Sequence, residues 1–251
     1  MEQPTPRAPR ITVVTVVRNA VADLPRCLES VARQGYPHLE HLVVDGASTD
    51  GTVALLRAAA GGRLRFVSEP DEGLYHAMNK AIGLAGGDFV LFLGADDALR
   101  ADLAEVAPRL RDGRTVYYGD AWLVGAGRAH DGPFGAAKLA LRNICHQAIF
   151  YPRAALARHR FDLRYRWLAD WELNMRCFSD PALRFEYLPV VVADYEDRRG
   201  RSSTMRDHAL ERDYLRLVWR HFPAWVAVLA TALSPARRLH LALRRPGGRA
   251  R

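Results

Sequence analysis

Short apolar runs alternate with segments of helical periodicity over the first 110 residues, and this alternation restricts the fold more than any other feature. The first run, ITVVTVV (11–17), is rich in β-branched residues, as expected of a strand buried on both faces of a parallel sheet. Apolar residues between Leu24 and Ala32 then recur every three or four positions, which predicts a helix. Further strands are predicted at 39–45, 63–68 and 88–93, and helices from Thr52, over 75–84 and near 101–110. The pattern predicts an α/β fold of right-handed βαβ units, with an open, mostly parallel central sheet flanked by helices.

Acidic residues stand at the carboxyl ends of these predicted strands. Asp45 ends the second strand, Glu69 and Asp71 follow the third, and Asp96 and Asp97 follow the fourth. Open parallel sheets bind their ligands at this edge. We therefore expect these carboxylates to surround one binding site.

The pattern changes after residue 113. Strands are predicted over TVYYGDAWLV (115–124) and FEYLPVVVADY (185–195), with an irregular region and a helix over 168–178 between them. This half is expected to complete the sheet. At 251 residues and 49% hydrophobic content, the chain is long enough for one large α/β domain with a C-terminal appendage, and too short for two average domains.

The net charge of +8 comes from the C-terminal region. From Arg216 to the end there are eight arginines and no acidic residue, so residues 1–215 are balanced. Because no zinc-finger, RNP-type or basic heptad pattern is present, we expect no nucleic-acid partner. Cys27, Cys145 and Cys177 form no CxxC pair, and the first ten residues lack the apolar core of a signal peptide. A cytoplasmic location is therefore expected.

Asp96 and Asp97 directly follow the apolar strand DFVLFL (88–93). Neighbouring carboxylates repel each other unless solvent or a cation neutralises them, and a hard divalent cation bound by carboxylate and phosphate oxygens does so. The pair could also simply cap the next helix. Asp45, followed by GASTDGT (46–52), could accept a hydrogen bond from a nucleotide base or ribose, or could hold a turn.

Four further segments of the chain are VVTVVRN (13–19), HLVVDGASTDGT (41–52), SEPDEGLYHAMNKAI (68–82) and AGGDFVLFLGADD (85–97). In order and spacing they resemble family 2 of the inverting glycosyltransferases, which have the GT-A fold. Within this family the chain looks most like bacterial enzymes that build exopolysaccharide, capsule or O-antigen units. The departures from the family pattern are Gly94, where many members have the first Asp of a D-x-D element, and Ala81, where Gly is common.

The resemblance implies a nucleotide diphosphate sugar as donor, lying across the ends of the first, second and fourth strands. Asp96, with Asp97 as a neighbour of less certain role, is implied to bind Mg²⁺ or Mn²⁺ together with the donor diphosphate. Such a cation would stabilise the charge that develops on the departing diphosphate. Gly94 would leave fewer carboxylates on the metal. The candidate donor-binding residues are Thr15, Arg18, Asn19, Asp45, Asp71, Asn79, Lys80, Ala95 and Asp96.

In the second half, RWLADWELNMR (166–176) places Asp170 at the start of a predicted helix. The resemblance implies that Asp170 is the general base, which takes the proton of the acceptor hydroxyl during a single inverting displacement. Asp170 could instead be a helix N-cap, and Glu172 is its nearest rival. The domain organisation expected from these assignments is a flexible N-terminus (1–10), a GT-A domain (11–215) with a nucleotide-sugar-binding half (11–112) and an acceptor half (113–215), and a basic amphipathic tail (216–251).

CHQAIFY (145–151) resembles a family segment near the acceptor, so His146 is a candidate acceptor contact, together with Trp171 and Glu172. Trp167 and Trp171 could stack on a sugar, although tryptophan is more often used in core packing. The polar loop YEDRRGRSST (195–204) could close over the diphosphate and exclude water, or be an ordinary exposed loop.

The tail contains a ten-residue apolar run, AWVAVLATAL (224–233), which is too short to span a bilayer. Arginines flank it, so it could lie in the headgroup region of an anionic membrane, on the inner face of the cell membrane, or pack on the body of the protein. The acceptor implied is a saccharide, on a lipid carrier if the tail binds membrane.

Two other functions remain open at this stage. A nucleotidyltransferase would share the alternating sheet and the aspartates, but usually has a Gly-rich N-terminal loop, which is absent between Val14 and Ala22. A degenerate sugar-nucleotide or membrane-binding module without turnover is the second, and Gly94 is the only feature that hints at it. The preferred hypothesis is a metal-dependent inverting glycosyltransferase of cell-surface polysaccharide biosynthesis.

Overall fold

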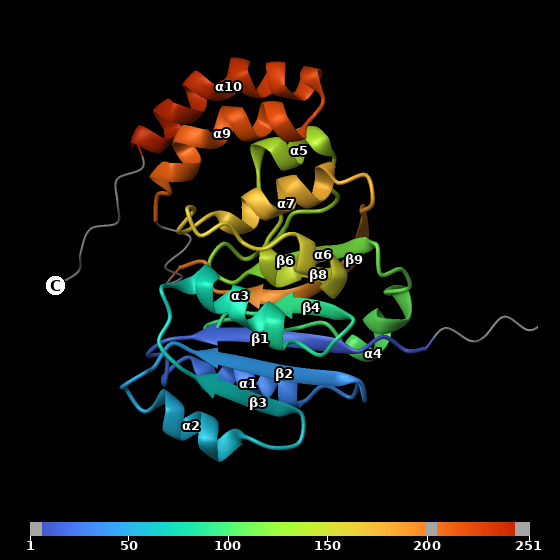
Figure 1. Cartoon of the computed structure of the whole chain (residues 1–251), viewed down its shortest axis with the longest axis vertical. Coiled ribbons are helices and arrows are strands. Elements are labelled where there is room, and N and C mark those ends of the chain that lie inside the picture. The colour runs from blue at the N-terminus through green and yellow to red at the C-terminus, as the bar shows by residue number, and fades with distance from the viewer. Residues whose placement is uncertain (1–6, 199–204, 244–251) are drawn as a thin grey trace, which may run out of the picture.

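The computed structural model describes residues 7–198 and 205–243 and contains the predicted parallel half-sheet (Figure 1). Its strands run in the order β3-β2-β1-β4, and every neighbouring pair is parallel. The elements are β1 (Ile11–Val17), α1 (Leu24–Ala32), β2 (Leu39–Asp45), α2 (Thr52–Ala59), β3 (Leu64–Ser68), α3 (Leu74–Leu84) and β4 (Phe89–Phe92). The βαβ prediction for this half is confirmed.

Beyond β4 the sheet becomes mixed, because the later strands enter beside β4 in the opposite direction. The order continues β4-β8-β6-β9-β5, with β7 paired to β6. In this half only β6 and β9 are parallel to each other. The strands are β5 (Ala98–Leu99), β6 (Thr115–Leu123), β7 (Arg128–His130), β8 (Ile149–Pro152) and β9 (Arg184–Tyr195). The sheet is therefore less parallel than the sequence pattern indicated, whereas the α/β class is as expected.

Short helices connect these strands. The helix expected near 101–110 is α4 (Leu103–Val106) followed by a 3₁₀ turn (Ala107–Arg109), and a second 3₁₀ turn (His146–Ala148) precedes β8. The helix expected over 168–178 is α7. The α-helices of this half besides α4 are α5 (Ala136–Leu141), α6 (Arg153–Arg158) and α7 (Ala169–Ser179).

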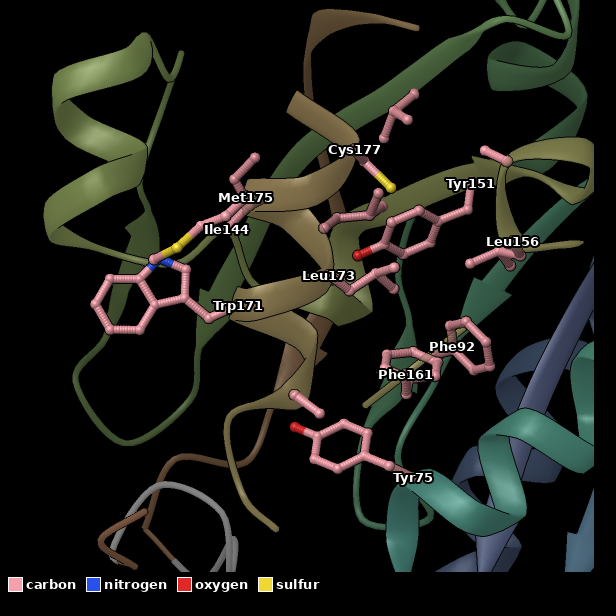
Figure 2. Close-up of a cluster of buried hydrophobic side chains, with 14 of the residues drawn as sticks. Tyr75, Phe92, Ile144, Tyr151, Leu156, Phe161, Trp171, Leu173, Met175 and Cys177 are labelled. Carbon is pink, nitrogen blue, oxygen red and sulfur yellow. The ribbon is translucent and has the colours of Figure 1, made fainter. Parts of the chain in front are cut away.

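Each face of the sheet is covered by its own apolar core. One core contains buried residues of α1, α2 and α4, and the other contains those of α3, α5, α6 and α7. In the second core, Phe161 stacks on Tyr75 with ring centroids 5.1 Å apart and meets Phe92 edge-on at 5.3 Å. Figure 2 shows these rings on one side of α7 and Trp171 on the other. Aromatic packing thus fixes the segment between α6 and α7, which carries Phe161, against α3 and β4.

Two C-terminal helices, α9 (His208–His221) and α10 (Ala224–Leu243), are stacked beyond α7 (Figure 1). The carboxylate of Asp207 caps α9 by accepting a hydrogen bond from the Leu210 amide (3.1 Å). Leu210 and Tyr214 of α9 join the core beside α7. Residue 216, where the tail is expected to begin, lies inside α9, and buried residues from both halves of this helix belong to that core.

Helix α10 packs on α9 and α5 through Val226, Ala227 and Ala230, which are buried. Its outward face is apolar as well, with Trp225 62% and Val228 58% exposed. No helix among the residues that the structure describes is long and apolar enough to cross a membrane.

Candidate active site

The loops that follow β1 and β2 are bound together at the carboxyl edge of the sheet. The Asn19 amide donates to Ser48 Oγ (2.7 Å), and the Thr49 amide donates to Asn19 Oδ1 (2.9 Å). Asn19 has a φ of 52°, a left-handed conformation that asparagine tolerates better than most residues. Asn19 thus shapes this edge through its backbone and its side chain.

Asp45, the last residue of β2, is buried and its carboxylate is already hydrogen-bonded. Ser48 Oγ donates to Oδ1 (2.5 Å), whereas the Ser48 amide (3.0 Å) and Ser68 Oγ (2.6 Å) donate to Oδ2. These donors satisfy a charge that would otherwise be costly to bury. The carboxylate therefore holds the ends of β2 and β3 in place beside the position expected for a nucleotide.

Gly46 allows Asp71 and Arg18 to approach Asp45. A Cβ at position 46 would lie 2.2 Å from Asp71 Oδ2 and 3.4 Å from Arg18 Cδ. Any side chain at Gly46 would consequently displace Asp71. The structure therefore brings Arg18, Asp45 and Asp71 together at the edge, as expected from their places after adjoining strands.

The Asp96–Asp97 pair follows β4 at the same edge. One strand, β1, separates β2 from β4, so these two strands lie about 10 Å apart across the sheet, or two strand spacings. Asp97 is buried and accepts hydrogen bonds from Gln147 Nε2 (2.8 Å), the Glu196 amide (2.9 Å) and the Gly94 amide (3.2 Å). Asp97 thus ties three segments together, and Asp96 is the more exposed carboxylate.

Electrostatics at this pair favour neutralisation by a cation or a proton. Burial, with the nearby Asp96, raises the pKa of Asp97 to about 6. Burial also raises the pKa of Asp96, and the charges of Asp23 and Glu196 add to this effect. A divalent cation at Asp96 would relieve the repulsion among these carboxylates.

Gly94 departs from the family's first Asp for a steric reason. A Cβ at position 94 would lie 2.4 Å from Asp97 Oδ2 and 2.9 Å from Asp96 Oδ1. The space that a first aspartate would need is thus occupied by the two carboxylates that follow. Among the described residues no group of three or more His, Cys, Asp and Glu side chains could hold a metal ion. A cation would therefore need oxygens of the donor and water besides Asp96, a ligand set that suits Mg²⁺.

Asp170, in the first turn of α7, accepts four hydrogen bonds. Its Oδ1 accepts from Tyr75 Oη (2.9 Å) and from the Trp171 amide (2.9 Å). Its Oδ2 accepts from Asn143 Nδ2 (2.8 Å) and is 3.1 Å from His146 Nδ1. Burial and the neighbouring Asp170 charge raise the pKa of Tyr75 well above its usual range, so Tyr75 stays a neutral donor. Asp170 is thus positioned by side chains from α3 and from the segment before β8.

Residues 145–147 link Asp170 to the Asp96–Asp97 pair. His146 contacts Asp170, and the adjacent Gln147 donates to Asp97. The charge of His146 also lowers the pKa of both Asp96 and Asp97. His146 is predicted from the sequence, whereas Gln147, Tyr75 and Asn143 are not. Tyr75 and Gln147 nevertheless lie inside the segments SEPDEGLYHAMNKAI (68–82) and CHQAIFY (145–151).

Several candidate residues lie elsewhere. Thr15 is fully buried, and its Oγ1 bonds His41 Nε2 (3.1 Å) within the core. Trp171 is 5% exposed and donates from Nε1 to the Leu139 carbonyl, so it packs in the core, which is the more common use of tryptophan. Glu172 pairs with Arg176 on a different face of α7 from Asp170.

Two further candidates of the donor-binding set, Asn79 and Lys80, have structural partners. The side-chain amide of Asn79 exchanges two hydrogen bonds with the backbone of Phe161. Lys80 Nζ is 2.8 Å from Glu69 Oε1 and also donates to the Pro70 carbonyl. Ala95 is half-buried between Gly94 and Asp96. Trp167, the other candidate stacking residue, is half-buried, and its carbonyl oxygen lies 2.9 Å from Tyr75 Oη. In the loop 195–204, residues 199–204 lie outside the described part of the chain, as do residues 1–6 and 244–251.

Comparison with known proteins gives the same class as the fold and the site. The structure is similar to that of S. aureus TarS in complex with UDP-GlcNAc, with a TM-score of 0.66, 21% identity, and coverage of 95% of this chain and 74% of the other. It also resembles a mannosyltransferase from Pyrobaculum calidifontis in complex with GDP-Man and Mn²⁺, with a TM-score of 0.64, 21% identity, and coverage of 96% and 81%. The chain spans 44% of the longer TarS chain. These likenesses show that the chain has the GT-A fold.

The family is fixed by sequence. Residues 12–165 match the model described as glycosyl transferase family 2, and the chain belongs to this family. A PGL/p-HBAD biosynthesis glycosyltransferase of Mycobacterium bovis (strain BCG / Pasteur 1173P2) is 43% identical over 209 residues, which are 80% of this chain and 82% of the relative. An uncharacterized glycosyltransferase of Mycobacterium tuberculosis (strain CDC 1551 / Oshkosh) is 34% identical over 180 residues, 67% and 69% of the two chains. The resemblance drawn from the motifs is confirmed.

Proposed function

We propose that this enzyme transfers a sugar from a nucleotide diphosphate sugar to a hydroxyl group of a saccharide acceptor, with inversion at the anomeric carbon. The observation that carries the proposal is that Asp45 and Asp96 lie at one edge of the sheet, while residues 145–147 connect Asp97 to Asp170. Donor binding, leaving-group stabilisation and proton removal would thus occur within one continuous site. Neighbours of the same fold that bind UDP-GlcNAc and GDP-Man support a nucleotide sugar as donor.

Asp96 is the residue proposed to hold Mg²⁺ or Mn²⁺ with the donor. When bound, the cation would stabilise negative charge on the departing nucleoside diphosphate. Asp97, the other predicted metal ligand, accepts three hydrogen bonds from protein groups, and we propose that it also supports the turn that carries Asp96. Asp45, Asp71 and Arg18 would contact the nucleoside end of the donor.

Asp170 is proposed as the general base, with His146 as its partner. As the acceptor oxygen forms a bond to the anomeric carbon, the bond from that carbon to the diphosphate oxygen breaks, and the acceptor proton passes to the Asp170–His146 pair. A carboxylate has about four lone-pair positions, and four donors already surround Asp170. An acceptor hydroxyl would therefore displace one of them, and half-buried His146 can move more readily than the Trp171 amide.

The acceptor and the location extend this proposal. The relatives act in PGL/p-HBAD biosynthesis by name, and we infer a cell-surface saccharide or lipid-linked saccharide as acceptor here. The exposed apolar face of α10, which includes Trp225 and Val228, supports attachment of the protein to the inner face of an anionic membrane. Co-sedimentation with phosphatidylglycerol vesicles tests this: binding should decrease in Trp225→Ser, and equal binding by this variant would contradict it.

A thermal-shift screen of nucleotide sugars with and without Mn²⁺ tests the donor assignment. The correct donor should raise the melting temperature more with Mn²⁺ than without it, and Asp96→Ala should lose this increment. Hydrolysis or transfer assays with that donor then separate an enzyme from a binding module. Stabilisation without turnover in any acceptor mixture would favour the binding module.

A further inference from the structure

A second polar cavity lies on the side of α7 away from Asp170. Its volume is about 550 Å³, and its walls come from the segment 158–164, from α7 and from the second half of α9. Glu172 lines this cavity, whereas Asp170 does not. Two residues along a helix correspond to a rotation of about 200°, so the two side chains point to opposite sides of α7. The cavity is thus separate from the candidate transfer site.

Positive charge dominates the lining. It has six arginines and two carboxylates, so arginines outnumber carboxylates by four within the lining itself. One histidine and one leucine complete it. The lining residues are Arg158, Arg160, Asp162, Arg164, Glu172, Arg176, Arg216, Leu217, Arg220 and His221. A lining with one apolar residue suits a charged ligand and not a hydrophobic one.

Ion pairs account for four of the six arginines. Arg164 pairs with Asp162 and Arg176 with Glu172, both within the cavity wall. Arg158 pairs with Asp180 (3.1 Å) and Arg216 with Asp213 (2.8 Å).

Within the described part of the chain, the ion pairs leave Arg160 and Arg220 without a carboxylate. Arg160 Nη1 donates to the Asn79 carbonyl (2.6 Å), which leaves its remaining N–H groups available. Arg160 and Arg220 lie on different walls of the cavity, so an anion bound between these walls would pair with both.

His221 lies in the same positive field. Burial, together with the charges of Arg220 and Arg176, lowers the pKa of His221 to about 4. The ring is therefore neutral near pH 7, and its Nδ1 lies 2.8 Å from Ser179 Oγ. A neutral imidazole adds no positive charge to the lining.

We propose that this cavity binds a phosphate-class oxyanion, such as a phosphomonoester, a diphosphate or a phosphodiester. Guanidinium groups donate two parallel hydrogen bonds to such oxygens. The volume exceeds what one phosphate needs and leaves room for a second phosphate or an attached group. The ligand could be a free phosphate compound or the headgroup of an anionic lipid. This proposal does not rest on the proposed transferase function.

Isothermal titration calorimetry with inorganic pyrophosphate, in EDTA and at constant ionic strength, tests the proposal. Saturable binding is expected, and Arg160→Gln/Arg220→Gln should weaken it about tenfold or more, since each lost charge-assisted hydrogen bond contributes over 1 kcal/mol. The matched control is Arg57→Gln/Arg109→Gln, which removes two exposed charges outside the cavity. Asp96→Ala should bind pyrophosphate as the wild type does, which separates this site from the donor site.

Equal weakening in both double variants would show an unspecific charge effect and would overturn the proposal, as would the absence of saturable binding. Arg160→Lys/Arg220→Lys keeps the charge and loses the paired donors, so intermediate affinity is expected even if the glutamine variant is unstable. Vesicles distinguish the two sources. Cavity-dependent binding to phosphatidylglycerol over phosphatidylcholine vesicles identifies a headgroup, and cavity-dependent binding to pyrophosphate alone identifies a soluble ligand.

Discussion

At the scale of single residues, the account depends most on Asp170 and the four donors around it. Asp170→Asn keeps the volume but removes the proton acceptor, so turnover should fall by about 100-fold or more. Donor binding, measured by thermal shift, should be unchanged. His146→Gln should cause a smaller loss, because the carboxylate remains. Wild-type turnover in Asp170→Asn would remove this residue from the mechanism, and lost donor binding would indicate a structural role instead.

Gly94 provides a second residue-scale prediction. Gly94→Asp would restore the family's usual aspartate, but its Cβ would collide with the carboxylates of Asp96 and Asp97. We expect a loss of about 1–3 kcal/mol in the free energy of unfolding and no gain in Mn²⁺ affinity. Gly113→Asp, at an exposed glycine with open space around it, is the control. Tighter Mn²⁺ binding in Gly94→Asp would mean that the site has room for another ligand.

A third residue-scale prediction concerns His41 and the stability of the protein in acid. Burial lowers the pKa of His41 to about 4, against about 6.5 in an unfolded chain. Between these pH values the unfolded chain binds more protons than the folded chain. The contribution of His41 to the free energy of unfolding is therefore fully present above pH 6.5 and is lost as the pH falls toward 4. From pH 7.5 to 5.0 the loss from this group should be about 2 kcal/mol in urea unfolding. His41→Gln should remove that part of the slope, while His38→Gln, at an exposed position, should keep it.

At the scale of elements, Asp207 joins the starts of α7 and α9. It caps α9 through the Leu210 amide and accepts from the amides of Trp167 (2.8 Å) and Leu168 (3.1 Å). Asp207→Ala should lower the free energy of unfolding by about 3 kcal/mol, because a cap and buried donors lose their partner. Turnover should fall as well, since the same carboxylate fixes the turn that precedes Asp170. Asp102→Ala, which removes the exposed cap of α4, should cost about 1 kcal/mol and leave turnover unchanged. Equal effects of the two substitutions would contradict the link.

Elements were predictable from sequence where burial is continuous. The strands β1, β2 and β4 are buried almost throughout, and their pattern needs no partner to be identified. The edge strand β3 was also predicted, although its Arg65 and Ser68 are exposed. The two-residue β5 and the three-residue β7 were not predicted, because such short strands exist only through pairing with β9 and β6. The start of α9 was missed for a similar reason, since its cap at Asp207 acts together with segments 40 residues away.

At the scale of the whole molecule, the site is only partly predictable. The edge that carries Asp45 and Asp96 follows from strand order in a parallel sheet, which the alternation predicts. The surroundings of Asp170 do not follow from the strand order, because Tyr75 is 95 residues and Asn143 is 27 residues away in the sequence. The burial of Thr15 and Trp171 likewise depends on which face of each element meets the core. Motif order thus locates the site, and tertiary packing decides which of its residues are free to meet a ligand.

The most direct test of the central claim is a crystal structure with Mn²⁺ and the nucleotide diphosphate sugar that gives the largest thermal shift. The account predicts an anomalous manganese peak beside the Asp96 carboxylate, bridged to the diphosphate, with the nucleoside near Asp45 and the sugar directed toward Asp170. A donor bound elsewhere, or manganese and nucleoside at separate places on the surface, would contradict it.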